Sequence, residues 1–206
     1  MPIADELNIL SKLDKRVLDL ALLARSEIIR RGIELAKISV NVSAKRIASP
    51  DLLDEIRNRD DIPKGGLAFE ILETAFFDSI NDDMRAQIDG LRKCGISIEV
   101  DDFGTGHASF ASVLALKPDV LKFDRMFVPG IDQDQSKREL MKGLIQIARN
   151  VHAQIVVEGV ETMSEVQILA ELGVDLLQGY ALGYPMRIDD FLDWATSYCH
   201  QKTLAQ

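Results

Sequence analysis

The chain has 206 residues, of which 47% are apolar and 28% are charged, and its formal net charge is −9 at pH 7. This composition is typical of one globular domain with a large core, and the acidic balance argues against binding of polymeric nucleic acid, which needs a basic surface. No apolar run reaches the roughly 18 residues of a membrane span, and no leader pattern opens the chain. The two cysteines have neither metal-site nor disulfide spacing, which favours a cytoplasmic location, although a parent protein could be membrane-tethered.

Strand-like and helical patterns alternate along the sequence. Strands are predicted at residues 37–43, 67–72, 97–102, 120–124, 154–159 and 175–182, and amphipathic helices near 6–31, 50–58, 79–94, 108–116, 134–151, 164–172 and 188–200. Glycines before the third and sixth strands, and Lys117-Pro118 before the fourth, are expected to end helices. This alternation predicts parallel strands with helical crossovers, in an open doubly wound sheet or a (β/α)₈ barrel. No glycine-rich loop follows the first strand, which weakens a dinucleotide-binding fold.

Each predicted strand carries a polar side chain late in its run, on the face opposite its most apolar one. These side chains are Asn41, Glu70, Asp101, Lys122, Glu158 and Gln178. In a barrel, catalytic groups gather at the carboxyl ends of several strands. We therefore expect these residues, together with Asp102, to meet at one functional site rather than to be separately solvated strand ends.

The expected site is rich in oxygen ligands. Four carboxylates and two amides, without a histidine or thiolate cluster, favour Mg²⁺ or Mn²⁺ over zinc. Adjacent Asp101 and Asp102 repel each other unless cations lie between them, and a carboxylate shared by two ions about 3.5–4 Å apart is typical of phosphoryl-transfer sites. Gly104 and Gly106 are expected to let the backbone leave the strand at Asp102. Lys122 is expected to orient a water or to stabilise negative charge.

Each of these residues alone also has a simpler structural interpretation. An Asp-Asp pair at a strand end is more often a helix cap than a pair of metal ligands. Lys122 alone could be an ion-pair partner of Glu99 or Asp124. Only the complete set favours a metal site.

The order of the motifs resembles the EAL-domain family of cyclic di-GMP phosphodiesterases. The segments NVSAKRI, FEILET, DDFGTG, LKFD, VEGVET, QGY and LGYP follow the family order, and PIADELNILSKLDKRVL resembles the helix after its second strand. DDFGTG is identical to the family's signature loop, and the resemblance covers essentially all of residues 1–206. It implies an α/β fold, a TIM-like (β/α)₈ barrel with an antiparallel first strand. It also implies hydrolysis of cyclic di-GMP to linear pGpG with Mg²⁺ or Mn²⁺.

The resemblance also implies individual roles by motif position. It implies first-metal ligands at Asn41, Glu70 and Asp101, with Asp101 bridging to a second metal that Asp102 and Glu158 help to hold. Lys122 and Gln178 resemble the pair that positions the nucleophilic water, and Glu73 resembles a glutamate that braces the signature loop. The residues implied to bind substrate or support the site are Asp124, Gly159, Glu161, Tyr180 and Pro185. Ca²⁺ is expected to inhibit, because its looser coordination holds water and phosphate less well.

Two departures from the family pattern carry further expectations. The six predicted strands are two short of a barrel, which typically takes about 250 residues, and no Glu-Ala-Leu segment is present. We therefore expect that the family's first two strands are absent from this chain, which would impair its first-metal site, rather than that the sheet is open by design. Glu99 replaces a small or apolar residue, and we expect it to pair with Lys122 or a neighbouring cation and to lower activity.

The resemblance finally implies partners. It implies a homodimer through the loop and helix that follow Asp101–Gly106, where His107 and Ala108 replace the usual aromatic residue and serine. It also implies a parent protein with sensory or cyclase domains. The alternative function is a catalytically inactive EAL domain that acts as a cyclic di-GMP receptor or a protein-interaction module. The retained Glu70, Asp102, Lys122 and Glu158 argue against this alternative.

Overall fold

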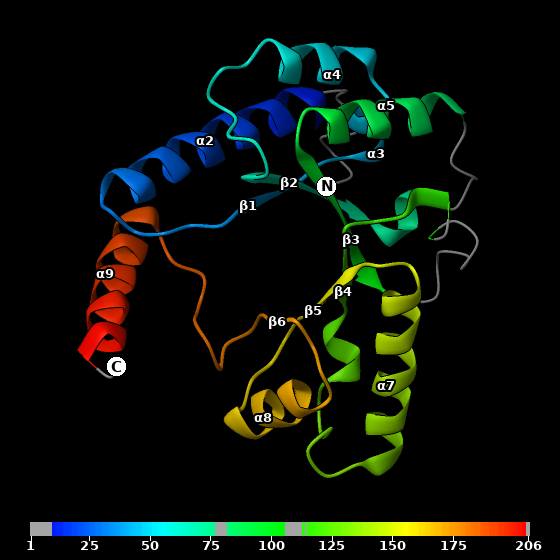
Figure 1. Ribbon diagram of the computed structural model, residues 1–206, viewed down its shortest axis with the longest axis vertical. Helices are drawn as coiled ribbons and strands as arrows, with labels where there is room; N and C mark the ends of the chain where they lie inside the picture. Colours follow the sequence, from blue (N-terminus) through cyan, green and yellow to red (C-terminus); the bar gives the residue numbers. More distant parts are fainter. Residues whose placement is uncertain (1–9, 77–81, 106–112, 114, 205–206) are drawn as a thin grey trace.

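Six parallel strands form a curled, open sheet in the computed structural model, which describes residues 10–76, 82–105, 113 and 115–204 (Figure 1). Their order in the sheet follows the chain: β1 (Ile38–Asn41), β2 (Leu67–Leu72), β3 (Ile96–Phe103), β4 (Val120–Phe123), β5 (Gln154–Val157) and β6 (Leu176–Leu177). Helices lie along the sheet, so the described part of the chain is a half-barrel. The predicted α/β class and parallel pairing are confirmed.

The helices agree with the predicted ranges to within a few residues, with one addition. They are α2 (Leu10–Arg30), α3 (Ala44–Ile47), α4 (Pro50–Arg57), α5 (Asp82–Lys93), α7 (Gln135–Asn150), α8 (Met163–Glu171) and α9 (Ile188–Leu204), with 3₁₀ turns η1 (Glu73–Phe76) and η2 (Arg125–Phe127). The helix predicted at 108–116 lies mostly outside the described residues. The sequence did not predict α3. This helix begins after Ser43, whose hydroxyl caps the helix by accepting a hydrogen bond from the Arg46 backbone amide. The Ser43 hydroxyl also donates to Asp14 on α2, at 2.7 Å.

The apolar side chains of the strands form the core, as strand alternation predicts. Those on the helix-covered side include Val40, Phe69, Ile71, Ile98, Leu121, Phe123, Ile155 and Val157, all buried and all in one cluster with apolar residues of the helices. Burying each such side chain contributes about 1.5–3 kcal/mol. The opposite side of the sheet is therefore left for the polar strand ends.

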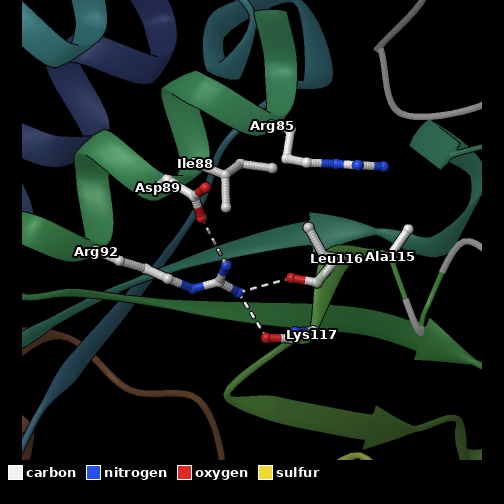
Figure 2. Close-up of a pocket in the computed structure, with 7 residues that line it drawn as sticks. All are labelled: Arg85, Ile88, Asp89, Arg92, Ala115, Leu116 and Lys117. Atoms are coloured by element: carbon white, nitrogen blue, oxygen red, sulfur yellow. Dashed lines mark hydrogen bonds and ion pairs between the residues drawn. The ribbon is translucent and has the colours of Figure 1, made fainter. Parts of the chain in front are cut away.

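Turns at the amino edge of the sheet hold the helices to the strands. Gly95 and Gly173 have φ of 84° and 88°, and Lys117 has φ of 49°, which confirms the predicted helix ends. Arg92 of α5 donates to the carbonyl oxygens of Leu116 and Lys117, at 2.8 and 2.6 Å (Figure 2). These contacts fix the position at which β4 begins.

The sixth strand is much shorter than the predicted 175–182. After Leu177, the backbone amide of Gln178 donates to the Val157 carbonyl at 2.9 Å. The chain then turns, and the backbone amide of Leu182 donates to the Gly179 carbonyl at 3.0 Å. Gly179 lies so close to the loop after β5 that an added Cβ would be 2.1 Å from the Val160 oxygen. The two segments therefore pack together as loops instead of extending the sheet.

An apolar groove of about 610 Å³ separates β1 from β6. Its lining includes Ile38, Leu177, Pro185 and Trp194. Helix α9 lies beside the end of α2 (Figure 1), where Ile28, Ile33, Leu192 and Ala195 form a second, smaller core. Among the described segments, no helix combines the length and apolar character that a membrane span requires.

Candidate functional site

The Lys122 ammonium is surrounded by carboxylates at the carboxyl end of the sheet. Its Nζ lies 3.0 Å from Glu70 Oε1, 3.2 Å from Asp101 Oδ1 and 2.6 Å from Glu158 Oε1. The three carboxylates come from β2, from β3 and from the residue that follows β5, and Lys122 lies on β4 with its side chain only 6% exposed. The structure thus brings together four of the polar strand ends that the sequence singles out.

A bulge in β3 presents Asp101 and Asp102. The register with β4 shifts between Val100 and Phe103, and Asp102 itself has φ of 56°, in the left-handed region. The expectation that the backbone leaves the strand at Asp102 is wrong, because the strand continues to Phe103. Aspartate tolerates the left-handed conformation of Asp102 better than most residues, at a cost of about 1–2 kcal/mol. The bulge allows two successive side chains to reach the same site.

The donor set fits a divalent cation bound by oxygen. One carboxylate oxygen each of Asp101, Asp102 and Glu158 lies within 4.8 Å of the others. Hard cations such as Mg²⁺ and Mn²⁺ take such oxygen ligands, whereas zinc sites usually include nitrogen or sulfur. Glu70 is linked to this group by its ion pair with Lys122, at 3.0 Å. Asn41 is the register partner of Glu70 in β1, and Asn41 is exposed.

The charges in this cluster are not balanced by Lys122 alone. Burial raises the pKa of Glu70, and the neighbouring Asp101 and Glu99 add to this increase, whereas Lys122 opposes it. The pKa of Asp102 is also raised, by burial and then by Asp101. Burial alone would lower the pKa of Lys122, but the hydrogen bond to Glu158 and the nearby carboxylates raise it above its usual value. A charged ammonium among crowded carboxylates leaves excess negative charge, which favours cation binding.

Glu99 forms its own ion pair, beside the cluster. The Glu99 carboxylate is buried, lies 2.7 Å from Lys37 Nζ and accepts a hydrogen bond of 3.0 Å from the Ser39 hydroxyl. Of the two partners that the sequence allowed, a neighbouring cation rather than Lys122 is the one observed. Its effect on activity stays a prediction.

Glu73 anchors the loop that follows the bulge. Its buried carboxylate accepts hydrogen bonds from the Thr105 amide at 3.2 Å and from the Thr105 hydroxyl at 2.9 Å. Glu73 therefore contacts the loop that it is expected to brace, and its role in the site stays a prediction. The next residues, 106–112, lie outside the described residues, and with them lies the loop expected to form a dimer.

A cleft of about 230 Å³ lies beside the cluster, between η2, the loop after β5 and the segment after β6. It is lined by the predicted residues Asp124, Glu158, Gly159, Glu161, Gln178 and Tyr180, and also by Arg125 and Gly179. Asp124 caps η2 by accepting from the Met126 amide at 2.8 Å. Pro185 lines the apolar groove instead. Sequence reasoning missed Arg125, although its place directly after a strand end was a usable signal.

Gly159 sets the shape of this cleft. Its φ is 69°, and an added Cβ would lie 2.2 Å from Arg125 Cβ. We expect Gly159→Ala to destabilise the protein by about 2–4 kcal/mol, from backbone strain and overpacking. Urea unfolding measures the loss, and Gly143→Ala is the control, because nothing lies within 4 Å of its added Cβ and alanine favours its helix. Equal unfolding midpoints for the two variants would contradict this account.

Comparison with known proteins identifies the family. The model of the EAL domain matches residues 1–185. The chain belongs to the EAL domain family. It is 33% identical over 172 residues to the cyclic di-GMP phosphodiesterase NbdA of Pseudomonas aeruginosa. This match covers 81% of this chain and 22% of NbdA. It is 31% identical over 196 residues to the bifunctional diguanylate cyclase/cyclic di-GMP phosphodiesterase MucR of the same organism, covering 93% of this chain and 28% of MucR. This EAL chain therefore spans about a quarter of the length of these curated relatives.

Solved EAL structures share the fold. The MucR phosphodiesterase in complex with c-di-GMP has a TM-score of 0.81 and 30% identity, covering 92% of this chain and 78% of that one. The EAL domain of Mycobacterium smegmatis DcpA has a TM-score of 0.80 and 26% identity, covering 87% and 82%. The curled six-stranded sheet is thus part of the TIM-like EAL barrel.

Proposed function

We propose that this EAL domain hydrolyses cyclic di-GMP to the linear dinucleotide pGpG with the help of divalent cations. The observation that carries this proposal is the grouping of Asp101, Asp102 and Glu158 oxygens within 4.8 Å, beside Lys122. The names of NbdA and MucR, both phosphodiesterases of cyclic di-GMP, support the substrate. In the reaction, water adds to one phosphorus and one phosphodiester P–O bond breaks, which leaves a terminal phosphate and a ribose hydroxyl.

The proposed roles follow from position. Asp101, Asp102 and Glu158 would hold Mg²⁺ or Mn²⁺, with Glu70 and Asn41 at the neighbouring strand ends. Bound cations activate water and neutralise charge on the phosphodiester. Lys122 would orient the attacking water and stabilise negative charge, and Gln178 offers an amide in the adjacent cleft. Glu73 would act as a positioning residue, through Thr105.

The choice of cation tests the proposal. We expect the intact protein to convert cyclic di-GMP to pGpG with Mn²⁺ or Mg²⁺, and we expect replacement by Ca²⁺ to suppress turnover while the dinucleotide stays bound. Chromatography of the nucleotides measures turnover, and isothermal titration calorimetry measures binding. Absence of metal-dependent turnover in the intact protein would overturn the proposal. Turnover in Ca²⁺ equal to that in Mn²⁺ would contradict the proposed ligand set.

The alternative is a receptor that binds cyclic di-GMP without hydrolysing it. The grouping of Glu70, Asp102, Lys122 and Glu158 argues against this alternative, because a receptor needs no set of residues that activates water. Binding without turnover, in both Mn²⁺ and Mg²⁺, would support the receptor.

We also propose the wider setting of the domain. Within the described sheet, β1 and β6 are edge strands, and the apolar groove between them supports completion of the barrel by two further strands. The cyclase named in MucR, and the short span of this chain on its relatives, support a parent protein with additional domains. A homodimer remains a proposal that rests on the family resemblance, and a cytoplasmic location remains one that rests on two cysteines without metal or disulfide spacing.

A further inference from the structure

The cleft beside the carboxylate cluster is large enough for one part of a dinucleotide. Its volume, about 230 Å³, is below the roughly 300–1,000 Å³ of pockets that enclose a drug-sized ligand. Glu158, which contacts Lys122 in the cluster, also lines the cleft. A ligand whose phosphate lies at the cluster can therefore extend a neighbouring group into the cleft.

Among the described residues that line this cleft, Arg125 is the one cation. Its side chain is exposed, and it makes no ion pair or hydrogen bond with another described residue. Its backbone is nevertheless held in place, because Asp124 caps η2 and the Gly159 backbone packs against Arg125 Cβ. The Arg125 guanidinium can therefore donate hydrogen bonds to a ligand, and its backbone is held in position.

An exposed aromatic ring lines the same cleft. Tyr180 is 55% exposed, and its ring stacks on Tyr184 with centroids 4.6 Å apart. Nucleobases stack on such rings with little dependence on sequence. A free arginine, by contrast, distinguishes bases, because its fork of N–H groups matches the O6 and N7 acceptors of guanine, whereas adenine presents an amino donor in place of O6.

We propose that Arg125 reads a guanine base of the substrate, donating to O6 and N7 while the base lies against Tyr180. This inference rests on the proposed function, because it assigns the base specificity of that same site. Arg125 then determines specificity through binding, whereas the chemistry stays at the carboxylate cluster.

Paired changes in protein and ligand test the contact. We expect Arg125→Met to weaken binding of cyclic di-GMP about tenfold, measured by calorimetry in Ca²⁺, and we expect the 7-deaza analogue of cyclic di-GMP to bind the wild type about tenfold more weakly. Because the two changes remove the same contact, the analogue should cost nothing further in Arg125→Met. Arg125→Lys keeps the charge but not the fork, and should behave like the methionine variant.

The control is Arg57→Met on α4, which should bind like the wild type, and unfolding midpoints confirm that each variant is folded. Unchanged affinity in Arg125→Met would overturn the inference. Additive losses from the two changes, or wild-type affinity in Arg125→Lys, would also overturn it, because they indicate a phosphate contact. Failure of the wild type to turn over cyclic di-GMP in Mn²⁺ would instead overturn the proposed function, and the inference with it.

Discussion

Asp101→Asn will lower Mn²⁺-dependent hydrolysis of cyclic di-GMP at least about 10²-fold, the usual scale for removing one electrostatic group from an active site. Asp101 Oδ1 lies 3.2 Å from Lys122 Nζ, and a carboxylate oxygen of Asp101 lies within 4.8 Å of oxygens of Asp102 and Glu158. Asparagine keeps the shape of this side chain but removes its charge, so affinity for the cation should fall as well. The measurement is kcat/KM, together with the Mn²⁺ concentration needed for half-maximal rate.

The matched control is Asp54→Asn, because Asp54 lies on α4 and is exposed. It should hydrolyse cyclic di-GMP at the wild-type rate. If Asp101→Asn also kept the wild-type rate and Mn²⁺ dependence, the assignment of this carboxylate to the cation site would be wrong.

Lys122→Met will destabilise the cation-free protein by about 3–5 kcal/mol, the range for breaking a buried ion pair from one side. Three carboxylates lie within 3.2 Å of Lys122 Nζ, and methionine leaves them without their counter-charge. Mn²⁺ should restore part of this stability, because cations replace the lost ammonium and bind only the folded state. Urea unfolding in EDTA and in Mn²⁺ measures both effects.

Lys142→Met provides the comparison, since Lys142 pairs with Glu139 on the surface of α7 and its side chain is 52% exposed. Surface pairs of this kind contribute about 0.3–0.5 kcal/mol. Similar losses in the two lysine variants, or a gain from Mn²⁺ no larger in Lys122→Met than in the wild type, would contradict the arrangement of charges described above.

Much of the cluster could be predicted because it depends on local geometry. Alternation along a strand places Glu70, Lys122 and Asp101 opposite the apolar face, and parallel pairing brings strand ends to one edge. Helix ends at Gly95 and Gly173 were predictable for the same reason. Predicting these features requires only the alternation of side chains along a strand and the preference of glycine for helix ends.

The features that escaped prediction depend on distant contacts. The bulge at Asp102 arises from the register with β4, and the short β6 from the approach of Gly179 to Val160. The choice of Lys37 as the partner of Glu99 depends on which side chains face each other across the sheet. Arg125 reaches its cleft through packing against Gly159. Residue patterns alone do not encode such pairings.

The most direct test of the central claim is the position of Mn²⁺ itself. Anomalous diffraction from crystals of the intact protein soaked with MnCl₂ should give a peak among the Asp101, Asp102 and Glu158 oxygens. Soaked crystals with ordered carboxylates and no peak there would contradict the account.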